Sequence, residues 1–439
     1  MASVIDTLRE RGFVAQMTET GLEAAAESRL VWYVGFDPTA PSLHVGHLLP
    51  VMAMAHVQRA GQGVILVLGG FTGLIGDPSG RASERTLLRE EDVRRNTEAI
   101  RAQLGRFLDF EGRNAAVTVD NADWLGPMSA LALLRDVGKH FSVKAMTRRE
   151  RVRTRLEQEE GLSFTEFAYP LLQAQDFAHL FDHFGCAVQI GGEDQWGNIV
   201  DGVDFVRRTR GARVHGLTLP LLTTASGEKF GKTAAGAVWL DPGRTSPFAL
   251  FQYFVNTADA DVGRLLRLFT FLGLDEIESL LGEQAARPEQ RPAQRHLAAE
   301  VVGLVHGLEA ARAAARAAAL LFGEPPDGLG PQDREMLRGD VPTTELGADD
   351  IADVVRVVDL LVRGGLSPSL GRARTLIREG GVSVNGVRVT EPMAAVGSEE
   401  FQRGPVLLRV GRKAHHLFVL AAGGGSAVSS SRAPGTGRA

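Results

Sequence analysis

Residues 31–47 read VWYVGFDPTAPSLHVGH, and this stretch decides the fold. It begins as a short apolar strand, turns at a proline, and ends in two histidines around a Val-Gly pair where a helix can begin. Ligands of parallel α/β sheets lie at the carboxyl ends of the strands, and His44 and His47 follow such an end. The sequence therefore predicts a functional site directly after this strand.

Short apolar runs alternate with helix-length segments through the first half of the chain. The runs are VWYVGF (31–36), VILVLGG (64–70), AAVTV (115–119), AVQIGG (187–192) and LTLPLLT (217–223). This alternation predicts an α/β fold with a Rossmann-like, doubly wound parallel sheet.

The pattern changes after the last of these runs, and the changes define the predicted domains. Residues 1–245 form the sheet domain, 246–322 an α-helical domain, and 323–348 a linker rich in proline and glycine. Residues 349–421 form a small α+β unit, and 422–439 are a low-complexity tail that we expect to be disordered.

Composition excludes several classes of protein. The chain of 439 residues has one cysteine, so it has no internal disulfide, which fits a cytoplasmic protein. No apolar run approaches the roughly 20 residues that cross a bilayer, so no membrane segment is expected. A net charge of -5 predicts that any nucleic-acid site is a local basic patch.

The HVGH histidines allow three interpretations. A zinc site needs a third protein ligand, and none is evident nearby, so no metal site is predicted. Two structural histidines with satisfied hydrogen bonds are the second interpretation. The third is phosphate chemistry: Gly46 lets a nucleotide approach the backbone, and imidazole N–H groups stabilise negative charge.

A second motif, KFGKT (229–233), favours the phosphate interpretation. Only five of the 48 basic residues are lysines, so Lys229 and Lys232 in one short segment are not expected to be surface filler. This segment follows the last predicted strand, so both motifs lie at the same end of the sheet.

A polar stripe marks a third part of the site. Tyr169, Gln173 and Asp176 recur at helical spacing among apolar residues, so they face either water or a buried polar ligand. Pro170 suggests that the helix that carries them begins there.

Several long strings in the sequence resemble bacterial-type tyrosyl-tRNA synthetases of class I. They are GFDPTAPSLHVGHL, GGFTGLIGDPSGRASERT, GKHFSV, SFTEFAYPLLQAQDF, QIGGEDQWGN and KFGKT, and they agree in order and spacing. HVGH and KFGKT look like the HIGH and KMSKS signatures of class I synthetases. The resemblance runs from about residue 3 to residue 420.

The resemblance implies a role for each site residue. Tyr33 and Asp176 would bind the phenolic hydroxyl of L-tyrosine. Tyr169, Gln173 and Asp77 would hold its ammonium group, and Gln195 would lie near its carboxylate. The remaining implied contacts are those of the nucleotide: Gly35, Asp37, Gly192 and Asp194 along the adenylate, Thr39 and His44 at the phosphates, His47 at the nucleotide, and Lys229, Lys232, Thr233, Arg81 and Arg85 at pyrophosphate.

The resemblance also implies partners. Mg²⁺ would accompany ATP, held by phosphate oxygens and water. The C-terminal unit resembles an S4-type RNA-binding domain, with Arg372, Arg374 and Arg378 at helical spacing for contact with tRNA(Tyr). Residues 361–420 hold nine basic and four acidic residues. A homodimer is implied by the family alone.

Three other functions compete with this interpretation. A small-molecule nucleotidyltransferase would also use HxGH, but it would not need the helical and S4-like parts. A tryptophanyl-tRNA synthetase is the nearest enzyme relative, and the Tyr33–Asp176 pair with GGEDQWGN favours tyrosine instead. An RNA-binding protein with an inactive synthetase domain would be expected to lose HVGH or KFGKT, and both are present.

Overall fold

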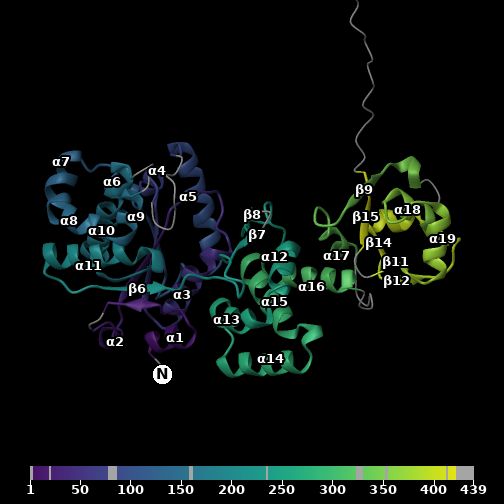
Figure 1. Ribbon diagram of the computed structural model, residues 1–439, viewed down its shortest axis with the longest axis horizontal. Coiled ribbons are helices and arrows are strands. Elements are labelled where there is room, and N and C mark those ends of the chain that lie inside the picture. Colours follow the sequence, from purple (N-terminus) through teal and green to yellow (C-terminus); the bar gives the residue numbers. More distant parts are fainter. Residues whose placement is uncertain are drawn as a thin grey trace, which may run out of the picture. The chain divides into compact units, whose positions relative to one another are not determined.

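The computed structural model describes residues 3–18, 21–77, 87–157, 162–233, 236–322, 330–351, 354–411 and 414–421 (Figure 1). The chain forms two compact units. The first, called the sheet unit, contains Met1–Ser246 and Tyr253–Leu308. The second, called the C-terminal unit, contains Pro247–Gln252 and Glu309–Ala439.

A mixed sheet of six strands, as far as the chain is described, forms the centre of the sheet unit. The strands are β1 (Gln16–Met17), β2 (Val31–Phe36), β3 (Gly63–Leu68), β4 (Val117–Asp120), β5 (Cys186–Gly192) and β6 (His215–Leu219). Their order is β1-β6-β5-β2-β3-β4, and only the pair of β1 and β6 is antiparallel. The predicted α/β fold with a doubly wound parallel sheet is confirmed. Strand β1 was not predicted, because two residues are too few to carry an alternating pattern.

The direction of winding reverses at β2. The chain leaves β2 through α3 (Leu48–Arg59) to β3 on one side, and β5, α11 (Trp196–Arg210) and β6 continue on the other side. A sheet that winds in both directions from one point has a crevice there, at the carboxyl ends of the two central strands. The segments that follow β2 and β5 therefore meet at this crevice.

The strands are apolar because helices cover both faces of the sheet. Every residue of β3 and of β6 is buried, as is typical of strands inside a parallel sheet. On β2, the ring of Tyr33 packs edge-on against Phe177 of α10 (Phe164–Phe184), with centroids 5.2 Å apart. The core thus extends from the central strand into the helix that carries the polar stripe.

Helix α10 begins earlier than the sequence suggests. Its first residue is Phe164, and the side chain of Ser163 caps it by accepting the N–H of Glu166 at 3.2 Å. Pro170 lies inside the helix, so the interpretation of Pro170 as its start is wrong. The proline removes one backbone N–H donor, and the cap and the buried helix face compensate for that loss. Pro50 is the third residue of α3, where helical N–H groups have no intrahelical partner.

The sheet unit continues beyond residue 245. The side chain of Arg11, which is buried, donates to the carbonyl oxygens of Arg267 and Thr270 at 3.0 Å each and also to that of Leu272. These carbonyls lie at and just beyond the end of α13 (Asp259–Phe269), so Arg11 caps that helix from the N-terminal segment.

The sheet unit contains further helices, the last two of which pack against α13. They are α1 (Val4–Glu10), α2 (Leu22–Ala25), α4 (Thr72–Ile75), α5 (Glu90–Leu104), α6 (Ala122–Leu125), α7 (Ala130–Ala132), α8 (Val143–Thr147), α9 (Glu150–Leu156), α14 (Leu274–Ala286) and α15 (Pro292–His306). Helices α12 (Pro247–Val255) and α16 (Leu308–Phe322) contribute residues to both units.

The C-terminal unit is a small α+β domain with its own apolar core. Within its described residues, β9 (Thr343–Leu346), β11 (Val382–Val384), β12 (Val387–Val389), β14 (Val406–Val410) and β15 (Ala414–Leu420) form a sheet of order β12-β11-β14-β15-β9. The remaining elements are α17 (Pro331–Glu335), β10 (Val354–Arg356), α18 (Val357–Arg363), α19 (Leu370–Arg378), β13 (Ala395–Gly397) and α20 (Ser398–Arg403). Strand β9 falls inside the predicted linker, so the ordered unit begins before residue 349.

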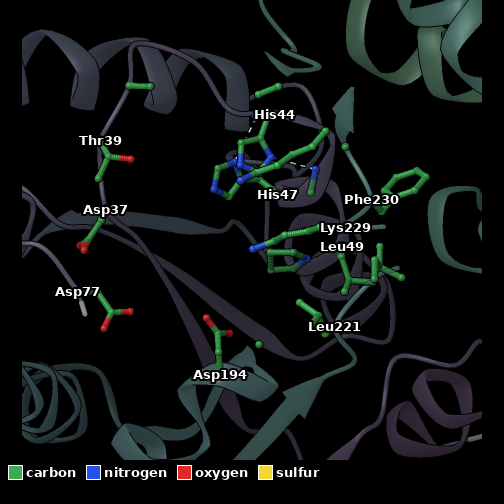
Figure 2. A pocket seen from close by; sticks show the side chains of 18 of the residues that line it. Asp37, Thr39, His44, His47, Leu49, Asp77, Asp194, Leu221, Lys229 and Phe230 are labelled. Atoms are coloured by element: carbon green, nitrogen blue, oxygen red, sulfur yellow. Dashed lines mark hydrogen bonds between the residues drawn. The ribbon is translucent and has the colours of Figure 1, made fainter. Parts of the chain in front are cut away.

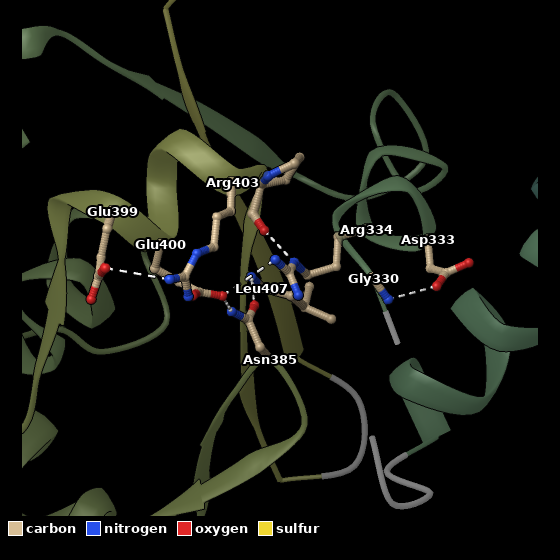
Figure 3. A network of polar contacts seen from close by, with 9 residues as sticks. Gly330, Asp333, Arg334, Asn385, Glu399, Glu400, Arg403 and Leu407 are labelled. Carbon is tan, nitrogen blue, oxygen red and sulfur yellow. Dashed lines mark hydrogen bonds and ion pairs between the residues drawn. The ribbon is translucent and has the colours of Figure 1, made fainter. Parts of the chain in front are cut away.

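A polar network attaches α17 to this domain (Figure 3). The buried guanidinium of Arg334 donates to the carbonyl oxygen of Pro405 at 2.5 Å and pairs with Glu400 at 3.3 Å. Glu400 also accepts from Asn385 at 2.8 Å, and the side-chain oxygen of Asn385 accepts the N–H of Leu407 at 2.8 Å. The segment before β9 is therefore a fixed part of the C-terminal unit.

No helix in the described residues combines the length and apolar character that crossing a membrane would need.

Candidate active site

Two adjoining cavities open at the crevice of the sheet unit. The smaller has a volume of about 270 Å³ and the larger about 940 Å³ (Figure 2 shows the larger). Residues that line both cavities are Asp37, Thr39, His47, Pro50, Asp77, Gly192 and Asp194. The two cavities are therefore one continuous site with two compartments.

One end of the smaller cavity is built to bind a hydroxyl group. The carboxylate of Asp176 accepts the indole N–H of Trp124 at 2.7 Å and the amide N–H of Asn121 at 3.1 Å. Beside it, the buried hydroxyl of Tyr33 has no hydrogen-bond partner among the described residues. A ligand hydroxyl at this position would satisfy the Tyr33 oxygen, which otherwise stays buried and unpaired at a cost.

Burial governs the charge of this end. It raises the pKa of Asp176 to about 7, with a smaller contribution from the Asp37 and Asp120 carboxylates, while the two N–H donors lower it. Burial also raises the pKa of Tyr33 well above its usual value, so its phenol stays protonated. Near neutral pH, Asp176 thus changes between a hydroxyl donor and a carboxylate acceptor.

The other end of the smaller cavity suits a cation. The hydroxyls of Tyr169 and Thr72 donate to the two carboxylate oxygens of Asp37 at 2.9 and 2.8 Å. The amide of Gln195 donates to Asp77 at 2.5 Å. These donors are neutral and fix the orientation of the two carboxylates. Two oriented carboxylates at one end of a cavity suit a ligand ammonium group, because opposite charges attract at this range.

An amide relay orients the glutamines of the site. The side-chain N–H₂ group of Asn198, on α11, donates to the amide oxygens of Gln173 at 3.0 Å and Gln195 at 3.2 Å. With both amide oxygens engaged, Gln173 presents its N–H₂ group as a donor, and Gln195 presents the N–H that it does not donate to Asp77.

The HVGH turn forms a wall of the larger cavity. The Nδ1 atom of His44 accepts the N–H of Gly46 at 3.0 Å, and the Nδ1 atom of His47 accepts the N–H of His44 at 3.1 Å. The rings stack with centroids 3.9 Å apart. A side chain at position 46 would collide with the His44 ring, since a Cβ there would lie 2.8 Å from its Cε1 atom. The turn therefore needs glycine at this position.

Both histidines are neutral at pH 7. The pKa of His44 is lowered to about 4 and that of His47 to about 3; burial is the largest cause for both, His44 also lowers the pKa of His47, and the Lys229 ammonium contributes to both shifts. Because each Nδ1 atom accepts an N–H, each ring carries its proton on Nε2. The turn thus presents two uncharged N–H donors.

The lysine loop lies beside this turn. Residues 223–229 form a tight hairpin in which Thr223 pairs with Lys229, followed by β7 (Lys232–Thr233) and β8 (Gly236–Ala237). The Val45 N–H donates to the Val238 carbonyl oxygen at 2.9 Å, so the two motifs are held together by backbone. In Figure 2, Lys229 points into the cavity toward Asp37 and Asp194. The expectation that both motifs lie at one end of the sheet agrees with this arrangement.

Most residues predicted from the sequence line these cavities. They are Tyr33, Gly35, Asp37, Thr39, His44, Gly46, His47, Asp77, Tyr169, Gln173, Asp176, Gly192, Asp194, Gln195, Lys229 and Lys232. Arg81, Arg85 and the tail 422–439 lie outside the described residues, as does the side chain of Thr233. In the C-terminal unit, Arg372, Arg374 and Arg378 are exposed on α19, while Ala373 and Ile377 face its core.

The structure adds residues that the sequence interpretation missed. Asn121 and Trp124 orient Asp176, and Asn198 orients Gln173 and Gln195. Asn121 and Trp124 closely follow β4, so the rule that ligands gather at carboxyl ends of strands could have identified them. Asn198 carries no comparable signal, because its role depends on how α11 packs against α10.

The chain belongs to the tRNA synthetases of class I for tryptophan and tyrosine, whose family description matches residues 25–323. Residues 333–418 match the C-terminal domain described as tyrosine--tRNA ligase SYY-like. Within the class, the chain is a member of the tyrosine--tRNA ligases. It is 50% identical over 420 residues to the tyrosine--tRNA ligase of Anaeromyxobacter dehalogenans (strain 2CP-C), covering 95% of this chain and 99% of the relative. It is 46% identical over 424 residues to that of Roseiflexus castenholzii, covering 96% and 100%.

Solved structures agree with this family. A C-terminally truncated mitochondrial tyrosyl-tRNA synthetase of Aspergillus nidulans is 35% identical, with a TM-score of 0.67 over 73% of this chain and 95% of the relative. A tryptophanyl-tRNA synthetase of Encephalitozoon cuniculi shares the fold, with 13% identity and a TM-score of 0.51 over 70% of this chain and 86% of the relative.

Proposed function

We propose that the two compartments bind L-tyrosine and ATP side by side and join them as tyrosyl-adenylate. One observation carries this proposal: the smaller cavity, which suits a hydroxyl group and a cation, is continuous with the larger cavity, which is lined by neutral imidazoles and lysine. Tyrosine fits the first cavity in one direction: hydroxyl at Tyr33 and Asp176, ammonium group at Asp77, Tyr169 and Gln173. Its carboxylate then lies near Gln195, at the junction with the second cavity.

ATP occupies the larger cavity in this proposal. Asp37 and Asp194, with Gly35 and Gly192, line the nucleoside, and Thr39 and His44 face the phosphates. His47 contacts the nucleotide. Lys229, Lys232 and Thr233, with Arg81 and Arg85, bind the departing pyrophosphate.

The reaction needs no covalent enzyme intermediate. A carboxylate oxygen of tyrosine attacks the α-phosphorus of ATP, forming a P–O bond as the bond to the β-phosphate oxygen breaks in line. Pyrophosphate leaves with that electron pair. The two Nε2–H donors stabilise charge on the phosphate oxygens without giving up a proton, and the lysines stabilise charge on the leaving group.

Mg²⁺ fits this site as a partner of ATP rather than of the protein. No three His, Cys, Asp or Glu side chains in the described residues are grouped to hold a metal ion. The carboxylates of Asp37, Asp77 and Asp194 line the cavities as oxygen donors of the kind that Mg²⁺ accepts through water. When bound, the ion would neutralise phosphate charge.

We further propose that the C-terminal unit binds tRNA(Tyr) and that the 3′-terminal ribose hydroxyl then takes the tyrosyl group from the adenylate. The exposed arginines of α19 support this proposal, since their spacing suits contact with successive phosphates. In these terms residues 1–245 carry the chemistry, while residues 246–322 and the C-terminal α+β domain contact tRNA.

A homodimer in the cytoplasm is the third part of the proposal. Large apolar side chains are exposed on helices α7–α10 and the short turns between them: Leu131, Leu134, Val143, Leu156 and Phe164. Exposed apolar side chains that gather on one segment are typical of protein interfaces. Sedimentation equilibrium measures the mass directly, and a monomer at micromolar concentration would contradict the dimer.

One experiment tests the central proposal: ATP–pyrophosphate exchange in the presence of each of the twenty amino acids. Exchange should depend on tyrosine, with phenylalanine far weaker because it leaves Tyr33 and Asp176 unpaired. Equal exchange with tyrosine and phenylalanine would contradict the assignment of the smaller cavity, and tryptophan-dependent exchange would favour the other branch of the family.

A further inference from the structure

The lysine loop has a second face, which packs against helices of the sheet unit. In Figure 2, Lys229 points into the site and its neighbour Phe230 points in the opposite direction. The ring of Phe230 is buried among Tyr253, Phe254 and Phe269, with centroids 5.5, 6.2 and 5.7 Å away. The loop is therefore anchored in an aromatic cluster formed by the last residues of α12 and the end of α13.

The next residue, Gly231, is held from two sides. Its N–H donates to the hydroxyl oxygen of Tyr253 at 2.9 Å. On its other side, a Cβ atom would lie 3.0 Å from the Val45 side chain and 3.2 Å from the Gly46 nitrogen, and its φ of +82° also requires glycine. The hydrogen bond to Tyr253 thus fixes the residue of the loop that packs against the HVGH turn.

Helix α13 holds the hairpin of the same loop. The carboxylate of Asp261, which is buried, accepts the N–H of Ala225 at 2.8 Å. The guanidinium of Arg264 donates to the carbonyl oxygen of Thr223. The hairpin and Gly231 are both attached to the helical segment, so the loop's position depends on α12 and α13 as well as on the sheet.

We infer that Tyr253 is a positioning residue for the lysine loop: its hydroxyl holds Gly231 so that Lys229 and Lys232, on either side of it, stay directed at the phosphates of ATP. This inference rests on the proposed role of the two lysines. Tyr253 does not line either cavity, so it acts through the loop and not on the substrates.

The test is a double-mutant cycle on single-turnover formation of tyrosyl-adenylate. Tyr253→Phe removes one hydroxyl and keeps the ring in its cluster. The rate should fall about tenfold, which is the rate equivalent of one hydrogen bond, and the dissociation constant of tyrosine should not change. In a Lys229→Ala, Lys232→Ala background, Tyr253→Phe should change the rate less than about twofold, because nothing is left for it to position.

A matched control separates positioning from stability. Gln284 is buried on α14 and donates to Asp259 at 3.2 Å and to the Pro288 carbonyl oxygen at 3.4 Å, so Gln284→Met also removes side-chain hydrogen bonds from the helical segment without touching the loop. It should lower Tm as much as Tyr253→Phe does and leave the rate unchanged.

The outcomes are distinguishable. An unchanged rate in Tyr253→Phe, or the same loss in the lysine-free background, overturns the role of Tyr253 alone. An equal loss of rate in Gln284→Met assigns the effect to stability and overturns it too. If replacing both lysines leaves the rate unchanged, the proposed function of the loop fails, and the inference fails with it.

Discussion

At the scale of the residue, the HVGH turn presents uncharged hydrogen-bond donors to the larger cavity. His44 and His47 use their Nδ1 atoms to complete the turn, so the part of each ring that remains for a ligand is Nε2–H. With pKa values of about 4 and 3, neither gains a proton above about pH 6. A neutral donor stabilises a phosphate oxygen without the tight ground-state binding that a full positive charge would give.

This arrangement predicts different effects for two amide replacements of His44. Asparagine can place an acceptor where Nδ1 is and so keep the cap on Gly46, but it lacks the Nε2 donor. Glutamine can place its N–H₂ group near the Nε2 position. We expect His44→Asn to slow adenylate formation by about 10²–10³, the range for loss of one charge-stabilising donor, and His44→Gln to lose less. Single-turnover kinetics measure the rate of adenylate formation in both variants. If His44→Asn is faster than His44→Gln, the atom that acts on ATP is Nδ1 and not Nε2.

The buried carboxyl of Asp176 predicts a dependence of stability on pH. Its folded pKa of about 7 lies above the unfolded value of about 4, so the folded state holds more protons between these values and loses stability as pH rises through them. Between about pH 5 and about pH 8, ionisation of this group should lower the free energy of unfolding by about 2–3 kcal/mol.

Asp176→Asn lacks that cost. The free energy of unfolding of the variant minus that of the natural chain should therefore be larger at about pH 8 than at about pH 5. This holds even if the substitution also changes stability by the same amount at both pH values. Urea unfolding at the two pH values measures the difference, and parallel shifts at both would show that Asp176 is ionised across the range.

At the scale of the element, the lysine loop and the HVGH turn act as a pair joined by backbone. Alanine at Lys229 or Lys232 should slow adenylate formation by the equivalent of about 2–4 kcal/mol, while tyrosine binding stays unchanged, because the loop lines only the nucleotide cavity. Stopped-flow rates and equilibrium dialysis with tyrosine separate the two quantities.

Lys229 has a second measurable effect. Since its ammonium lowers the pKa of both histidines, Lys229→Ala should raise these values and move any loss of activity in acid to higher pH. If Lys229→Ala changes neither the rate of adenylate formation nor the acidic side of the pH–rate profile, Lys229 does not act in the site.

Some helices and strands could be predicted from the sequence, and others could not. Long periodic segments predicted the sheet and its alternation with helices, because buried parallel strands read as apolar runs. Strand β9 could not be predicted, since Thr343–Leu346 is ordered by pairing with β15 far along the chain. The true start of α10 was obscured by Pro170, because the helix is held by its cap and its buried face. Asn198 and Tyr253 depend on packing between helices, which no local pattern encodes.

At the scale of the whole molecule, the proposed function assigns chemistry and tRNA contact to different parts of the chain. A chain that ends near Gly323 keeps every residue that lines the two cavities. It should fold and catalyse tyrosine-dependent pyrophosphate exchange, but it should lose most charging of tRNA(Tyr), because the phosphate contacts that we propose for α19 would be gone. Exchange and aminoacylation assays on the truncated and full chains measure both halves.

A full-length variant with alanine at Arg372, Arg374 and Arg378 is the control for this truncation. It should bind tRNA more weakly, while pyrophosphate exchange stays unchanged. The slope of the logarithm of the tRNA binding constant against the logarithm of the salt concentration should fall by about one unit for each phosphate that the variant no longer neutralises. Full charging activity by the truncated chain would show that the C-terminal unit is not needed for tRNA.

The cap that Arg11 places on α13 has a consequence for biosynthesis. Its acceptors, the carbonyl oxygens of Arg267, Thr270 and Leu272, lie more than 250 residues further along the chain. The ribosome therefore releases the donor long before the acceptors exist, and the guanidinium stays hydrated until α13 emerges. The cap on α13 thus forms late, although α1 itself packs against the nearby helix α3, and a nascent chain stopped before residue 267 would leave Arg11 open to solvent and to proteases.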